Sequence, residues 1–214
     1  MIERKSKDEI EQTSAVAAAG RLFRAYEQHC RRPGVDTLFN TLTSMHSLND
    51  RLRSAVDHDF HKIDEFVALK ALRNFTHHQE EVRANVCVIP SPAMSDLLFL
   101  CIVRRDQVER AIESVDKRWR AHTRGACEGK FHWYGPAVNI NPCLFNFMVR
   151  AYELLMEFDV FPPKDAVESF ENSYQLEVEN GQSHFVDGRF ESHAADVQAV
   201  LLAVVAELPK PQAS

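Results

Sequence analysis

Apolar residues recur three and four positions apart along most of this chain, which is the spacing of amphipathic helices. The pattern is clearest over residues 36–56, where the apolar stripe comprises Leu38, Phe39, Leu42, Met45, Leu48, Leu52 and Val56. Similar patterns predict helices over residues 8–29, 62–82, 142–158, 165–178 and 192–208. Proline and glycine between them indicate short connections. The pattern therefore predicts a mostly α, single-domain bundle of six or seven helices over residues 1–214, with 209–214 as a flexible tail.

Three segments depart from the helical pattern. Residues 86–92, Val-Cys-Val-Ile-Pro-Ser-Pro, predict a short extended piece that ends in a rigid turn. Residues 95–122 predict a helix, although its first part could instead be a strand, a choice that periodicity alone does not settle. The turn dipeptides Asn180-Gly181 and Asp187-Gly188 allow a small β-hairpin near 175–190.

The helix predicted for residues 62–82 changes character along its length. Near its start, one arc of the helical wheel is apolar, with Ile63, Phe66 and Val67. One or two turns later the same arc carries Lys70, Arg73, Asn74, His77, His78 and Glu81. A surface helix keeps its polar stripe on one side throughout. Two interpretations follow: a core helix whose second half reaches water, or a helix that passes from the core into a polar cleft.

Composition and charge narrow the class of protein. A chain of 214 residues can bury a full core, and 45% hydrophobic with 26% charged residues is typical of a globular protein. The formal net charge of −6 argues against non-specific nucleic-acid binding. Any contact with RNA must therefore be local, because long-range attraction to phosphates would be weak.

The sequence also indicates a compartment. Five cysteines are scattered without a Cys-x-x-Cys pair, which fits a reducing compartment and disfavours a disulfide framework or a zinc ribbon. The first residues lead into Asp8 and Glu9 rather than an apolar run, so no signal peptide is expected. The longest apolar stretches, 97–103 and 199–206, are too short to span a bilayer. We expect a cytoplasmic protein with no membrane contact.

One short motif carries candidate chemistry. In Arg73-Asn74-Phe75-Thr76-His77-His78, an arginine is followed by asparagine, three further residues and a histidine. Two other pairs share the spacing but lack the asparagine: Arg24/His29 and Arg53/His58. At Arg73, Asn74 and His78 the chain resembles the HEPN superfamily of helical-bundle proteins, many of them metal-independent ribonucleases of toxin–antitoxin and antiviral systems. The resemblance covers six residues and a helical setting. It implies an endoribonuclease toxin or defence effector with an RNA substrate, an antitoxin partner and no cofactor.

The residue types suit that chemistry. Cleaving RNA without a metal requires that the 2′-hydroxyl lose its proton and that the developing phosphorane charge be held. An imidazole titrates near neutral pH, which suits His78, and a guanidinium offers forked donors to phosphate, which suits Arg73. Asn74 can orient the histidine or the phosphate. The resemblance implies a 2′,3′-cyclic phosphate and a 5′-hydroxyl as products.

Helical geometry raises a difficulty for the motif. Positions five apart lie about 140° from each other, so Arg73 and His78 do not share a face, whereas Arg73 and His77 do. An irregular helix, a long arginine side chain or a two-fold dimer would each remove the difficulty. HEPN nucleases resemble the dimer case, with paired motifs that form a composite cleft. We therefore predict a homodimer through the Lys62–Val82 helix, with His77 as a second candidate for the catalytic role.

Other interpretations stay open. A metal site could use His58, His61, His77, His78 and Glu81, although no spacing matches a specific metal motif. A non-catalytic helical interaction protein, which the acidic balance favours, would leave Arg73 and His78 structural. In the irregular aromatic segment 130–141, Trp133 and Tyr134 could stack a nucleobase, but packing over the core is the favoured interpretation.

Overall fold

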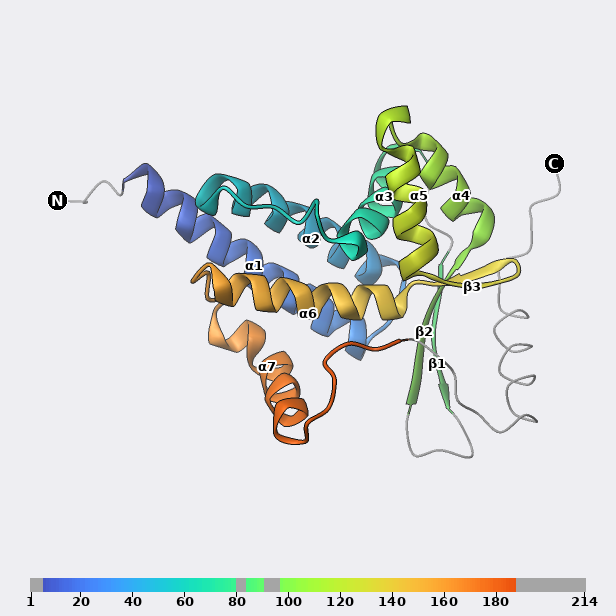
Figure 1. The fold of residues 1–214 in the computed structure, drawn as a ribbon. Coiled ribbons are helices and arrows are strands. Elements are labelled where there is room, and N and C mark those ends of the chain that lie inside the picture. The colour runs from blue at the N-terminus through green and yellow to red at the C-terminus, as the bar shows by residue number, and fades with distance from the viewer. Residues whose placement is uncertain (1–5, 80–83, 91–96, 188–214) are drawn as a thin grey trace.

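A computed structural model describes residues 6–79, 84–90 and 97–187, with only the course of the backbone for 84–90 and 97–99. Within this part of the chain the protein has seven helices and one four-stranded antiparallel sheet (Figure 1). The predicted fold class, a mostly α bundle with a small β element, is confirmed. The predicted helix 192–208 and the tail 209–214 lie outside the described residues.

The bounds of the elements agree with most of the predicted segments. The helices are α1 (Lys7–Arg31), α2 (Val35–Val56), α3 (Asp64–His78), α4 (Arg105–Ser114), α5 (Lys117–Lys130), α6 (Asn141–Glu157) and α7 (Lys164–Glu179). The strands are β1 (Ala84–Pro90), β2 (Leu97–Arg104), β3 (His132–Tyr134) and β4 (Ala137–Asn139). None of the helices in the described ranges combines the length and the apolar character needed to cross a membrane.

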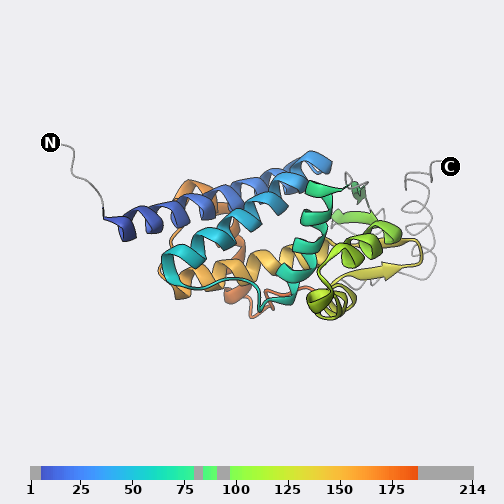
Figure 2. The ribbon, with the colours of Figure 1, turned by 90° about the horizontal axis from the view of Figure 1, so that it is seen from above.

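The long helices α1, α2 and α6 lie side by side (Figures 1 and 2). A capping box begins α1: Ser6 accepts a hydrogen bond from the Glu9 N–H, and the Glu9 carboxylate accepts one from the Ser6 N–H. The predicted apolar stripe of α2 is buried at Leu38, Leu42, Met45, Leu48 and Leu52. Because that stripe packs against α1 and belongs to the same hydrophobic core as residues of α6, burial of apolar surface stabilises the helical part of the fold.

The sheet has the strand order β1-β2-β4-β3. Val86 pairs with Cys101 in the first hairpin, and Val138 pairs with both Val103 and Trp133. The predicted extended segment is thus confirmed over residues 86–90, whereas residues 91 and 92, which belong to the predicted rigid turn, lie outside the described residues. The predicted long helix over 95–122 is wrong for its first part, where the strand alternative holds. Leu100–Val103 is a continuous buried apolar run, which favours a central strand over an amphipathic helix.

The β-hairpin expected near 175–190 is not present within the described residues, which end at 187. Instead α7 continues to Glu179, and residues 180–187 form turns and bends. The second hairpin is β3–β4, in the segment predicted to be irregular, with Gly135 at its turn in the left-handed region (φ 55°).

Helix α3 lies at the junction between the long helices and the part formed by α4, α5 and the sheet (Figure 2). It contacts α2, α4, α5 and α6. It is shorter than the predicted 62–82 helix, because it begins at Asp64 and ends at His78. Phe66, Ala68 and Leu69 are fully buried, whereas residues 77–79 are exposed. The helix therefore runs from the core to the surface, as its change of character indicated.

Candidate functional site

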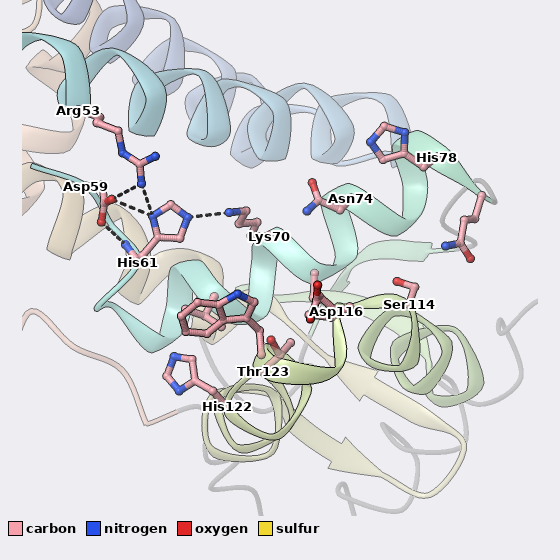
Figure 3. Close-up of a pocket in the computed structure, with 15 residues that line it drawn as sticks. Arg53, Asp59, His61, Lys70, Asn74, His78, Ser114, Asp116, His122 and Thr123 are labelled. Carbon is pink, nitrogen blue, oxygen red and sulfur yellow. Dashed lines mark hydrogen bonds and ion pairs between the residues drawn. The ribbon is translucent and has the colours of Figure 1, made fainter.

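A cleft of about 680 Å³ opens beside α3 (Figure 3). One wall is α3, with Lys70, Asn74 and His78, and the opposite wall is α5 with the turn before it. The connection between α2 and α3 contributes Asp59 and His61. This volume is in the range of small-molecule and nucleotide sites, and charged side chains are concentrated on the α3 side.

The connection between α2 and α3 is held in place by a buried hydrogen bond. Asp57 ends α2 in the left-handed conformation (φ 50°), which turns the chain toward α3. The Phe60 N–H donates to Asn49 Oδ1 at 2.9 Å, and both residues are buried. The Phe60 ring packs edge-on against Phe147 at 5.3 Å. Asp59 and His61, on either side of Phe60, are thereby fixed at the mouth of the cleft.

Asp59, His61 and Lys70 form a hydrogen-bonded relay (Figure 3). The Lys70 ammonium donates to His61 Nε2 at 2.6 Å. Since Nε2 accepts, the proton of a neutral imidazole lies on Nδ1, which is 3.0 Å from Asp59 Oδ2. Arg53 also pairs with Asp59. The relay thus joins α2, the α2–α3 connection and α3 through one chain of contacts.

The surroundings shift the pKa values of the two ends of the relay. Burial lowers the pKa of Lys70; Asp50 and Asp59 raise it, while Arg53 and Arg73 lower it, and the net shift is downward. Burial alone would raise the pKa of Asp59, but hydrogen bonds from Arg53 and His61 hold it well below its usual range. Lys70 therefore gives up its proton more readily than an ordinary lysine, while Asp59 stays ionised.

The cleft wall formed by α3 has a regular polar stripe. Lys70, Asn74 and His78 are spaced by four residues, so they lie on successive turns of one face (Figure 3). Each step along the helix is about 6 Å. Asn74 therefore lies between a cation and an imidazole along the length of the cleft.

The structure brings together only part of the predicted motif. Asn74 and His78 line the cleft, but Arg73 lies in a separate shallow groove against α2, beside His46 and Asp50. Arg73 remains connected to the cleft indirectly, because its Nη1 donates to Asn74 Oδ1 at 3.2 Å. The ring of His77 is 4.7 Å from that of His78, but His77 does not line the cleft. Within one chain, Arg73 and His78 do not share a face, as helical geometry predicted.

Several cleft residues were not selected from the sequence as candidate site residues. Arg53 and Asp59 precede α3, and Trp119 and His122 belong to α5. The polar residues 57–61 were a visible signal, since they interrupt two strongly apolar helices. Trp119 gave no such signal, although 55% of its surface is exposed at the cleft. Its position depends on how α5 packs against α3, which periodicity does not show.

The alternative sites proposed from the sequence are not brought together. The His58 ring lies tilted against the Phe158 ring, with 4.7 Å between the ring centroids, whereas His61 belongs to the relay. Among the side chains that the structure describes, no cluster of three or more His, Cys, Asp and Glu residues could hold a metal ion. Glu81, the remaining member of that proposed set, lies outside the described residues.

Trp133 of the aromatic segment packs against the core, as the favoured interpretation expected for this residue. Trp133 Nε1 donates to the Cys127 carbonyl at 3.2 Å, and the Arg105 guanidinium lies 5.4 Å from the ring. The ring also packs against the hydrophobic core. Trp133 is thus engaged on several sides, which disfavours a role in stacking a base.

Comparison with protein-family models, with curated proteins and with solved structures finds no match to this chain. The residues that line the cleft and their contacts are therefore the basis for a function.

Proposed function

We propose that this protein is a metal-independent endoribonuclease of HEPN type, and that the cleft beside α3 binds the RNA. The observation that supports it is the stripe of Lys70, Asn74 and His78 in a cleft large enough for a nucleotide. Two of these three residues belong to the motif that resembles HEPN proteins.

His78 is proposed as the general base. Its imidazole takes the proton of the 2′-hydroxyl while the 2′-oxygen attacks phosphorus, which gives a 2′,3′-cyclic phosphate and a 5′-hydroxyl. Asn74 donates to a phosphate oxygen through its amide nitrogen. The Arg73 guanidinium supports this arrangement because it holds Asn74 Oδ1, which directs the amide nitrogen away from Arg73.

We also propose that the active form is a homodimer. Arg73 does not line its own cleft, so the arginine at the phosphate would come from a second copy. Most of α3 is covered by neighbouring helices of the same chain, and its exposed C-terminal residues are His77 and His78. The contact between copies would therefore use the C-terminal end of α3 rather than the whole predicted Lys62–Val82 helix.

The biological setting follows from the activity. An RNA-cleaving toxin or antiviral effector needs a partner that restrains it, so we propose an antitoxin protein that covers the cleft. A cytoplasmic location fits this role, and in the described part of the chain the thiols of Cys30, Cys127 and Cys143 form no disulfide.

The test is cleavage of single-stranded RNA by the purified protein in excess EDTA. We expect the wild type to cleave, and His78→Ala to lose about 100-fold or more of the activity. Arg73→Ala should lose activity as well. Arg24→Ala is the matched control, because Arg24 has a histidine at the same spacing but lies half-buried on α1, outside the cleft, where it pairs with Asp165. Equal activity in the wild type and His78→Ala would overturn the proposal.

Mixing the two inactive variants tests the dimer. If Arg73 acts mainly across the interface, rather than through Asn74 of its own chain, a mixed dimer of Arg73→Ala and His78→Ala contains one site with both His78 and the arginine of the second copy. Random exchange of equal amounts should then restore about a quarter of the wild-type activity. No recovery in a mixture that has exchanged subunits would show that Arg73 acts within its own chain, through Asn74.

A non-catalytic interaction protein is the second candidate, and the net charge of −6 favours it. Absence of cleavage by the wild type, on single-stranded and structured RNA alike, would leave this candidate in place.

A further inference from the structure

Cleavage of RNA by 2′-hydroxyl attack needs two proton transfers. One group removes the proton of the 2′-hydroxyl, and a second group must protonate the 5′-oxygen as the phosphorus–oxygen bond breaks. The motif at residues 73–78 supplies one imidazole in the cleft, His78. Another residue of this cleft must therefore act as the general acid.

Lys70 has the right position on α3. It lies two turns from His78 on the same stripe, with Asn74 between them. The two backbone positions are about 12 Å apart along the helix, and the Lys70 ammonium group is held on the His61 side of the stripe. A phosphate held at Asn74 would therefore lie between the imidazole and the ammonium group.

Lys70 is also held in place by contacts that suit an acid. Its ammonium group donates one hydrogen bond to an imidazole nitrogen at 2.6 Å, and two further N–H donors are left for a ligand. His61 is in turn held by Asp59 through Nδ1, and its own N–H donates to Asp59 Oδ1 at 3.0 Å. These contacts fix the direction of the Lys70 side chain along the cleft (Figure 3).

We propose that Lys70 is the general acid of the reaction and that His61 and Asp59 are its positioning residues. In the step, the bond from the 2′-oxygen to phosphorus forms as His78 takes the 2′-proton. The bond from phosphorus to the 5′-oxygen breaks, and that oxygen takes a proton from Lys70 Nζ. Lys70 then regains a proton from water. The downward shift of the Lys70 pKa supports this role, since an acid works best when its pKa is near the working pH. The inference rests on the proposed ribonuclease activity.

Leaving-group chemistry tests this role. A uridine dinucleotide needs a proton on its departing 5′-oxygen, whereas uridine 3′-(4-nitrophenyl phosphate) releases 4-nitrophenolate, which leaves without one. Both substrates form the same cyclic phosphate. Lys70→Arg keeps the positive charge but cannot give up a proton at neutral pH.

We expect Lys70→Arg to slow the dinucleotide by about 100-fold and the aryl ester by less than about threefold. His78→Ala should slow both substrates alike. His61→Gln should also slow the dinucleotide more than the aryl ester, but by a smaller factor than Lys70→Arg does. The reason is that it removes the hydrogen bond that positions Lys70 and keeps the lysine itself. Lys62→Ala, an exposed lysine before α3, is the control and should change neither rate.

The outcomes separate the two proposals. If the wild type is active but Lys70→Arg slows both substrates equally, or slows neither, the proposed role of Lys70 is overturned while the ribonuclease proposal stands. Wild type that cleaves neither substrate overturns the ribonuclease proposal and this role with it. If Lys70→Arg fails to fold by circular dichroism, Lys70→Met takes its place, and the same ratio of the two rates decides.

Discussion

The cleft beside α3 and the groove between α1, α6 and α7 are two hollows in one helical fold, with different linings. Of the twelve residues that line the groove, which has a volume of about 250 Å³, five are aromatic, including Phe23, Phe170 and Tyr174. Phe23 and Phe170 pack edge to face at 5.2 Å. The cleft instead holds a relay of ionised and neutral polar groups. The difference separates a hollow left by side-chain packing from one with a polar wall, which is the one proposed to bind a ligand.

The largest expected effect on stability lies in the aromatic groove. Phe23 is 2% exposed and contacts both Tyr152 and Phe170, so Phe23→Ala should lower the free energy of unfolding by about 3–5 kcal/mol. The measurement is urea unfolding followed by circular dichroism. RNA cleavage per folded molecule should not change, since the groove is proposed to serve packing alone. A folded Phe23→Ala protein that has lost cleavage would contradict the division between the two hollows.

The helical part should also be the source of acid sensitivity above pH 4. Burial lowers the pKa of His29 to about 4, so the unfolded chain binds a proton there before the folded one does. The contribution of neutral His29 to the free energy of unfolding is complete above the ordinary histidine pKa and is lost as the pH falls toward 4. The shift corresponds to about 3 kcal/mol. Urea midpoints between pH 7 and 4 measure it.

A variant separates His29 from the other groups that titrate in this range. His29→Asn should be less stable at pH 7 but should show a flatter decline toward pH 4. Asp59, by contrast, has a lowered pKa, so its contribution is complete above the ordinary carboxyl pKa and is lost progressively as the pH falls below that value. If the urea midpoint of His29→Asn declined between pH 7 and 4 as steeply as that of the wild type, another group would be the source of the acid sensitivity.

A smaller effect is expected where the cleft is attached to the helical part. Asn49→Ala removes the acceptor of the buried Phe60 N–H, which should cost about 1–3 kcal/mol. It should also slow RNA cleavage, because Asp59 and His61 lose their anchor. Ser54→Ala, an exposed position on the same helix, should change stability by less than about 0.5 kcal/mol. Thermal unfolding and cleavage rates check both variants.

The sequence predicted the fold well where local periodicity decides the structure. The apolar stripe of α2 and the strongly apolar α6 needed only the spacing of their own residues. The β2 strand was harder to predict, because Leu97–Arg104 has no alternation and its burial depends on α4 and α6 packing beside it. The hairpin near 175–190 was wrong because α7 continues to Glu179, so the turn dipeptide Asn180-Gly181 follows a helix rather than connecting strands.

The site was predictable only on one helix. Asn74 and His78 were selected from the motif, and Lys70 was visible on the same polar arc. The partners of Lys70 come from the α2–α3 connection, and Trp119 comes from α5. Their meeting depends on tertiary packing, such as the buried Asn49–Phe60 hydrogen bond, which no spacing along the chain reveals. The position of Arg73 outside the cleft, in contrast, followed from helical geometry alone.

The most direct test of the account is phosphorus NMR of a uridine dinucleotide incubated with the protein in EDTA. A 2′,3′-cyclic phosphate signal should grow with time when the wild type or Arg24→Ala is present, and it should be nearly absent when His78→Ala is present. An unchanged phosphodiester signal with the wild type, or the same cyclic product with His78→Ala, would contradict it.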